Sequence, residues 1–90
     1  MVLYYRGQRF EVDTDRFIIG RGKANNHLTI KDPNVSRQHC MVERLNGTYF
    51  IVDMGSTNGI EFNGKRLQRK PIQGGDTFHI CDHELRFAFE

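Results

Sequence analysis

The 90-residue sequence has few cysteines and prolines and no long apolar run. No segment approaches the roughly 20 apolar residues of a membrane-spanning helix, so we expect no membrane insertion. The N-terminus, MVLYYRGQRF, introduces charge too early for a signal peptide. Cys40 and Cys81 both lie in apolar, strand-like runs, and one disulfide is possible although no spacing indicates it. We therefore expect a cytoplasmic protein with two buried, reduced thiols.

The composition is that of one folded domain. Hydrophobic residues make up 38% of the chain and charged residues 27%, and only two positions are proline. These fractions fill a modest interior and are unlike those of a disordered segment. The last residues, LRFAFE, end an alternating segment without a tail. We expect residues 1–90 to form a single domain that is a module of a longer protein.

Positive charge is concentrated in two segments. The net charge of +2 is too small to indicate a nucleic-acid-binding protein by itself. Residues 16–37, however, contain five lysines and arginines against Asp32 alone, and KRLQRK at 65–70 has four cations and no carboxylate. Two basic loops on a nearly neutral body indicate a local anionic partner.

The hydrophobic pattern is that of an all-β protein. No window of eleven or more residues has helical spacing, and short apolar runs alternate with polar residues at period two. Asn46-Gly47 and Asn63-Gly64 separate such runs, and this dipeptide favours the positive φ angles of a tight hairpin turn. About ten short strands with turns between them predict a sandwich of two antiparallel sheets.

Three loops between the predicted strands are unusually polar. They are GRGKANN at 20–26, KDPNVSRQ at 31–38 and GSTNG at 55–59. Loops that are far apart in the sequence cluster in space at one end of a sandwich. We expect these three to converge in this way.

The side chains of these loops have the chemistry of an anion site. Arg21 and Arg37 supply guanidinium groups, and Ser36 and Thr57 supply hydroxyls. A phosphate monoester is bound by this combination, through charge-assisted hydrogen bonds to its oxygens. Asn58 adds a donor and an acceptor that suit an extended peptide backbone.

Each of these residues, taken alone, also has an ordinary structural explanation. GSTNG is a common type of hairpin turn, and Ser36 could be a capping hydroxyl. His39 beside a strand is more often a structural histidine than a base, and Arg21 could be a solvated strand end. Only the occurrence of all of them together, in order, favours a binding site.

The combined pattern resembles the forkhead-associated (FHA) domain over roughly residues 4 to 88. The matching pieces are GR at 20–21, N-x-L-x-I at 26–30, SRQH at 36–39, D-x-GSTNG at 53–59, FNG at 62–64 and GGD at 74–76. The resemblance implies a β-sandwich of about eleven short strands whose loops at one end bind phosphothreonine in an extended peptide. It implies no cofactor and no catalytic activity.

The family pattern also implies a role for each matching residue. Those expected to contact the phosphate are Arg21, Ser36, Arg37 and Thr57, and Asn58 is expected to hold the peptide backbone. Gly20 and Gly59 would permit backbone turns. His39 would tie the SRQH loop to its neighbour.

The resemblance further implies a regulatory role and contains one departure. The domain would dock a phosphothreonine-containing partner, or a segment of its own chain, after a Ser/Thr kinase has acted. Cys81 stands where the family often has glycine, in the last hairpin, whose role we expect to be opposite to that of the recognition loops, so that phosphate binding is not affected. Lys23, Asn34 and Arg66 are candidates for selectivity beyond the phosphothreonine.

Other functional classes find less support. Ser36, His39 and Asp53 contain the residue types of a nucleophilic triad, but the GxSxG elbow is absent. His79, Cys81 and His83 could alternate onto one face as metal ligands, although a fourth ligand is lacking. No RNP-type run indicates RNA binding. An FHA fold that binds its partner independently of phosphate remains the main alternative.

Overall fold

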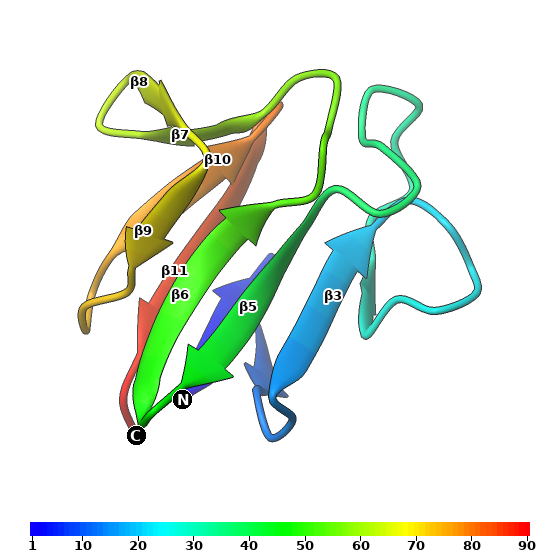
Figure 1. The fold of residues 1–90 in the computed structure, drawn as a ribbon. Coiled ribbons are helices and arrows are strands. Elements are labelled where there is room, and N and C mark those ends of the chain that lie inside the picture. Colours follow the sequence, from blue (N-terminus) through cyan, green and yellow to red (C-terminus); the bar gives the residue numbers. More distant parts are fainter.

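The computed structural model describes residues 1–90 as eleven strands in two facing sheets, with no helix (Figure 1). The strands are β1 (Val2–Tyr5), β2 (Gln8–Glu11), β3 (Arg16–Gly20), β4 (Leu28–Thr29), β5 (Cys40–Leu45), β6 (Thr48–Asp53), β7 (Ile60–Phe62), β8 (Lys65–Leu67), β9 (Arg69–Pro71), β10 (Thr77–Ile80) and β11 (His83–Ala88). The predicted all-β sandwich is confirmed. No helix is present that could cross a membrane.

The two sheets share the strands almost equally. One has the order β2-β1-β11-β10-β7-β8, and the other has the order β4-β3-β5-β6-β9. All pairs are antiparallel except β3 and β4, which run parallel with Ile19 opposite Leu28. This exception arises because the polar 20–26 loop folds back beside the end of β3, where the His27 amide donates to the Ile18 carbonyl at 2.7 Å.

Both Asn-Gly hairpin turns form as predicted. Asn46 and Gly47 have φ angles of 52° and 79°, and Asn63 and Gly64 have φ angles of 52° and 78°. Two consecutive positive φ angles match the right-handed twist of the flanking strands. These turns set the registers of β5 with β6 and of β7 with β8.

The second basic segment is not the loop that the sequence predicts. Residues 65–70 form most of two short strands, β8 and β9, which lie at the edges of different sheets. The basic residues masked the strand pattern because edge strands tolerate charge, and lysine at an edge opposes unwanted pairing. Pro71 ends β9, which is consistent with the confinement of proline to edge strands.

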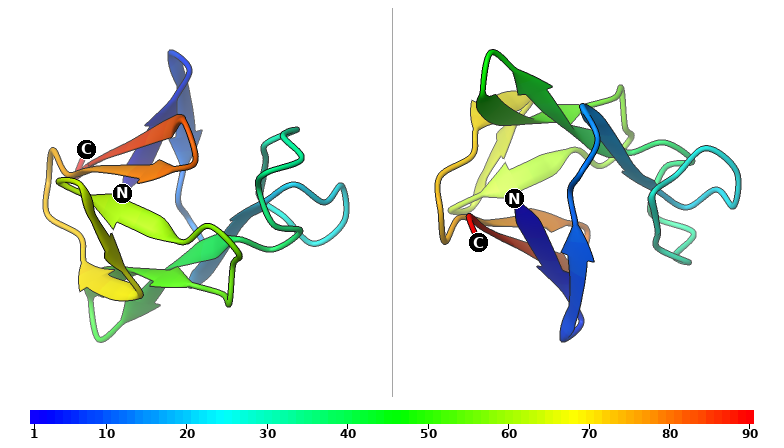
Figure 2. Two further views of the ribbon diagram at one scale, coloured as in Figure 1. Left: turned by 90° about the horizontal axis from the view of Figure 1, so that it is seen from above. Right: turned by 90° about the horizontal axis from the view of Figure 1, so that it is seen from below.

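A single hydrophobic core fills the space between the sheets, which Figure 2 shows as two facing layers. It contains 17 buried hydrophobic residues, and its aromatic centre is Phe78, in contact with Phe62 and Phe87. Each such side chain contributes about 1.5–3 kcal/mol when it is fully buried. The core therefore supplies the rigid base from which the connecting loops project.

The polar loops and the chain termini lie at opposite ends of the sandwich. In Figure 1 the loops after β3, β4 and β6 project from one end, and the N- and C-termini lie together at the other. The termini are held by the Val12 amide, which donates to the Met1 carbonyl at 3.0 Å, and by a Tyr4–Glu90 hydrogen bond. The loop end is thus remote from both termini.

Candidate functional site

The first two polar loops are joined through their backbones. The Arg21 amide donates to the Ser36 carbonyl at 2.9 Å, and the Gly22 amide donates to the Arg37 carbonyl at 3.2 Å. Residues that are fifteen positions apart are thereby held side by side. This pairing brings the first and second polar loops together at residues 21–22 and 36–37.

The third polar loop joins the second through side chains. The Thr57 amide donates to the Ser36 hydroxyl oxygen at 3.2 Å. The Asn58 side-chain amide donates to the Asn34 carbonyl at 2.7 Å. The three loops therefore converge at one end of the sandwich, as the sequence predicts.

A cleft of about 550 Å³ opens between the converged loops. It is lined by Arg21, residues 33–37, Thr57 and Asn58. All five side chains predicted to contact phosphate or peptide line this one cleft. No aspartate or glutamate lines it, so its electrostatic character is set by two arginines.

Several polar side chains of the cleft have hydrogen-bond donors that have no partner within the chain. Arg21 uses its Nε group to hold the Val35 carbonyl at 2.9 Å, which leaves its terminal nitrogens unbonded. Arg37 is exposed and makes no side-chain hydrogen bond or ion pair within the chain. Ser36 accepts from an amide and keeps its own O–H available, and the Thr57 hydroxyl has no partner. Such preorganised, unpaired donors are what an anion requires.

Gly20 is required at the site for a reason other than the predicted one. Its φ angle is not positive, so it does not serve as a turn glycine. A Cβ atom at Gly20 would instead lie 2.1 Å from the Arg37 carbonyl oxygen. The Asn26 side chain donates to the same oxygen at 2.9 Å. Close approach of the two loops, rather than backbone freedom, accounts for the glycine.

His39 lies beneath the cleft and is fully buried. Its Nδ1 accepts from the Ser36 amide at 3.1 Å, so the ring proton is on Nε2, which donates to the Gly59 carbonyl at 2.7 Å. One imidazole thus holds the second and third loops together. Both ring nitrogens are bonded to backbone groups, which leaves neither available to act as a base.

Asp53 and Ser56 shape the third loop. The Asp53 carboxylate accepts from the Gly55 and Ser56 amides at 3.2 Å each and from the Ser56 hydroxyl. The Ser56 oxygen in turn accepts from the Gly59 amide at 2.8 Å, and Gly59 has a φ angle of 76° that favours glycine. Ser56 is a site residue that the sequence did not reveal, although an aspartate three residues before a serine is a recognisable turn signal.

These contacts are incompatible with the triad considered from the sequence. Ser36, His39 and Asp53 each have separate partners, and His39 contacts the Ser36 amide rather than its hydroxyl. The three residues form no nucleophile–base–carboxylate chain. These residues instead hold the polar loops in place.

Cys81 contradicts two expectations from the sequence. It is a half-buried turn residue with a φ angle of 55°, rather than a buried strand residue, which explains why the family often has glycine there. Its hairpin is also not separate in role from the polar loops, because its thiol donates to the Asn34 carbonyl at 3.2 Å and lies 3.8 Å from the Asn58 amide nitrogen. Burial raises the pKa of the Cys81 thiol, so it stays protonated as a donor.

The other cysteine, Cys40, behaves as expected. It is free and fully buried in the core, and burial raises the pKa of its thiol.

The candidate metal ligands do not converge. His79 faces Glu84 at 3.8 Å and His83 contacts Asp32, so each of the two histidines has a different neighbour.

A series of hydrogen bonds from Asp32 through His83 to Tyr5 supports the second polar loop. The Asp32 carboxylate accepts from the Asn34 amide at 2.9 Å and from His83 Nε2 at 2.7 Å, and His83 Nδ1 meets the Tyr5 hydroxyl at 2.9 Å. The Asn34 amide, and then His83, hold the pKa of the Asp32 carboxyl below its usual range. The second loop is therefore tied to β1 and β11.

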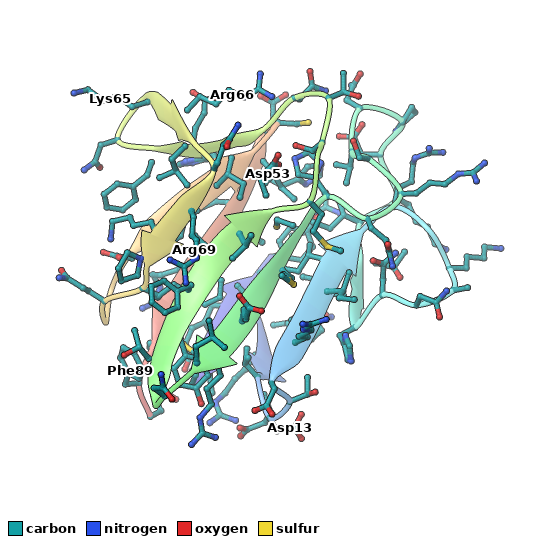
Figure 3. The ribbon with its side chains drawn as sticks, viewed as in Figure 1. Asp13, Asp53, Lys65, Arg66, Arg69 and Phe89 are labelled. Carbon is teal, nitrogen blue, oxygen red and sulfur yellow. The ribbon has the colours of Figure 1, made fainter.

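Arg66 is the member of the second basic segment that reaches the third polar loop. Its Nη2 lies 3.5 and 3.4 Å from the carbonyl oxygens of Ser56 and Thr57. Figure 3 shows Arg66 beside the loop that follows β6, with Lys65 farther out and Arg69 down the sheet. Of the other selectivity candidates, Asn34 lines the cleft, and Lys23 lies in the first loop outside it.

Comparison with known proteins confirms the family. The FHA domain model matches residues 17–81 of this chain, so the chain belongs to the FHA domain family. The transcriptional regulatory protein EmbR of Mycobacterium tuberculosis is 33% identical over 64 residues, which cover 70% of this chain and 16% of that protein. The oxoglutarate dehydrogenase inhibitor of Corynebacterium diphtheriae is 31% identical over 81 residues, 90% of this chain and 56% of the inhibitor.

Solved structures agree with this assignment. Mycobacterium tuberculosis EmbR in complex with a low-affinity phosphopeptide superimposes with a TM-score of 0.87 at 29% identity, over 97% of this chain and 24% of that one. The FhaA FHA domain complexed with the intracellular domain of Rv3910 gives a TM-score of 0.85 at 25% identity, over 94% and 96% of the two chains. This chain therefore spans only a small part of EmbR and little more than half of the inhibitor.

Proposed function

We propose that this domain binds phosphothreonine in an extended peptide and so docks a phosphorylated partner, or a phosphorylated segment of its own chain. The observation that carries the proposal is the cleft in which Arg21, Ser36, Arg37 and Thr57 meet without a carboxylate. Two guanidinium groups and two hydroxyls match the charge and the acceptor oxygens of a phosphate dianion.

The expected affinity follows from the number of donors. A hydrogen bond to a charged group contributes about 1.5–3 kcal/mol. Three or four such bonds, less the costs of desolvation and ordering, support roughly micromolar binding, or about −8 kcal/mol. This strength suits reversible docking.

Asn58 is proposed to hold the peptide backbone. Its side-chain nitrogen is occupied by the Asn34 carbonyl, but its Oδ1 accepts no hydrogen bond within the chain. That oxygen is available to a peptide N–H group. The contact would fix an extended peptide across the second and third loops.

The relatives support a regulatory context. The solved EmbR structure contains a phosphopeptide, and the FhaA domain is complexed with part of another protein. By analogy, we propose that residues 1–90 are the recognition module of a longer regulatory protein that acts downstream of a Ser/Thr kinase. A cytoplasmic location is supported by the two free cysteines. The proposed role is recognition without catalysis or a cofactor.

The decisive experiment is a titration with one peptide pool in three forms: phosphothreonine, phosphoserine and unmodified threonine. We expect binding of the phosphothreonine form, and at least a tenfold loss, about 1.4 kcal/mol, in Arg21→Ala and in Ser36→Ala. Arg9→Ala is the matched control, because Arg9 pairs with Glu11 and Glu90 near the termini. Thermal unfolding of each variant verifies that the fold is retained.

Equal binding of the three forms would overturn the proposal. It would instead favour an FHA fold that binds its partner independently of phosphate. Loss of binding in Arg9→Ala as well as in Arg21→Ala would also contradict it, because the effect would then not be specific to the cleft.

A further inference from the structure

A second, smaller hollow adjoins the proposed phosphate cleft. It has a volume of about 360 Å³ and is lined by Arg21, Lys23, Lys31, Asp32 and Pro33. We call it the lateral hollow. It shares Arg21 and Pro33 with the cleft, so the two are contiguous.

The two lysines of the lateral hollow are not used by the fold. Lys23 and Lys31 are exposed and make no side-chain hydrogen bond or ion pair within the chain. The ion pairs that lysines and arginines form in this molecule lie elsewhere, as in Lys70 with Asp76 at 2.7 Å. Two lysines without a structural partner, next to a cleft for an anion, are available to a ligand.

The one carboxylate in the hollow does not neutralise these lysines by direct contact. Both oxygens of Asp32 are occupied, one by the Asn34 amide at 2.9 Å and the other by His83 at 2.7 Å. Asp32 therefore has a structural role, in which it holds the second polar loop. The hollow keeps an excess of positive charge over the single carboxylate.

Arg21 connects the lateral hollow to the cleft. Its Nε group is held by the Val35 carbonyl at 2.9 Å, which fixes the guanidinium at the boundary between them. The lysines lie on one side of that boundary, and Ser36 and Thr57 lie on the other. A ligand with two anionic groups could therefore occupy both places at once.

We propose that Lys23 and Lys31 form a subsite for a second anionic group of the same phosphopeptide. This inference rests on the proposed function. The group is either an acidic side chain or a second phosphate, because both offer anionic oxygens to an ammonium group. An extended peptide advances about 3.3 Å per residue, so the position of this group relative to the phosphothreonine has to be scanned residue by residue.

The test uses a phosphothreonine peptide with neutral flanks as its reference. One series places a single aspartate at each position from the fourth residue before to the fourth residue after the phosphothreonine, and a second series places phosphoserine there. Each peptide is titrated against the wild type, the double variant Lys23→Ala/Lys31→Ala, and Lys65→Ala. Lys65 is a matched exposed lysine that lies away from the first two polar loops, as Figure 3 shows.

The expected result is specific to position and to the two lysines. On one side of the phosphothreonine, an added anion should raise wild-type affinity by about threefold to tenfold at low salt. This gain, measured on each protein relative to the reference peptide, should disappear in the double variant and persist in Lys65→Ala. A gain from phosphoserine alone would identify a second phosphate as the ligand, and a gain from aspartate would identify an acidic flank.

Two outcomes overturn the inference and leave the proposed function intact. In the first, no added anion raises affinity, although the reference peptide binds and Arg21→Ala abolishes its binding. In the second, the gain is the same in the double variant, which would indicate a general field instead of a subsite. If the reference peptide does not bind the wild type, the proposed function itself fails, and the inference fails with it.

Discussion

The two basic segments of this chain both carry an excess of positive charge and use it in opposite ways. In residues 16–37, Arg16 in β3 pairs with Glu43 at 3.7 Å, but the loop cations Arg21, Lys23, Lys31 and Arg37 form no ion pair with a carboxylate. In residues 65–70, Lys70 pairs with Asp76 and lies 4.5 Å from the centre of the Phe62 ring, and Arg69 stacks 3.8 Å over Phe50. The first segment leaves the charges of its loop side chains unpaired, and the second uses charged side chains to stabilise its edge strands.

The difference lies in what holds each backbone in place. The loops of the first segment are held chiefly by buried His39 and by the Asp32–His83 pair. Lys23, Lys31 and Arg37, and the terminal nitrogens of Arg21, are therefore free for a ligand. The second segment is held by the pairing of β8 with β7 and of β9 with β6, and its Arg69 and Lys70 side chains add contacts of their own. A run of positive charge indicates a binding surface only where the fold leaves its cations without partners.

Removal of His39 is expected to have the largest effect. His39→Ala leaves the Ser36 amide and the Gly59 carbonyl without their partner in a buried site, and each lost partner costs about 1–3 kcal/mol. Unfolding free energy and phosphopeptide affinity should both fall, as measured by denaturant titration and by calorimetric binding. Unchanged values of both would show that His39 does not hold the two loops.

Removal of Lys70 should separate stability from binding. Lys70→Ala deletes a partly buried ion pair and a cation–π contact, so we expect a loss of about 1 kcal/mol in unfolding free energy. For a domain of this size the melting temperature should fall by about 4–8 °C. Phosphopeptide affinity should stay within twofold of the wild type.

Lys65→Ala is the control for this effect, since Lys65 is exposed at a hairpin and its side chain makes no hydrogen bond or ion pair within the chain. It should change stability by less than about 0.5 kcal/mol. A loss of affinity in Lys70→Ala comparable with that in Arg21→Ala would remove the distinction between the two basic segments.

The smallest effect is expected from Asp32, the only carboxylate of the first segment. Because its pKa is lowered in the folded chain, the unfolded chain binds the proton at higher pH. Its stabilising contribution is thus present above the ordinary aspartate pKa of about 3.9 and is lost as the pH falls through the folded value. The difference in melting temperature between the wild type and Asp32→Asn should shrink from pH 6 to pH 3. A difference that grows instead would reverse this assignment.

The sequence predicted those parts of the fold that depend on local chemistry. The Asn-Gly turns and the period-two strands follow from backbone preference and side-chain alternation, and the polar loops met as expected. Strands β8 and β9 were missed because their charged residues reveal no alternation. Local pattern also failed for Cys81, whose contact with Asn34 joins residues that are 47 positions apart. Likewise, only the distance to the Arg37 carbonyl reveals why position 20 is glycine.

The placement of both termini opposite the recognition loops sets a minimum tether for any self-association. The longest dimension of the domain is 32 Å. At about 3.3–3.6 Å per extended residue, a phosphorylated segment joined to either terminus would need on the order of ten residues of linker to reach its own cleft. A shorter linker would direct that segment to the cleft of a second copy, so linker length alone could decide between an intramolecular latch and a head-to-tail chain of molecules.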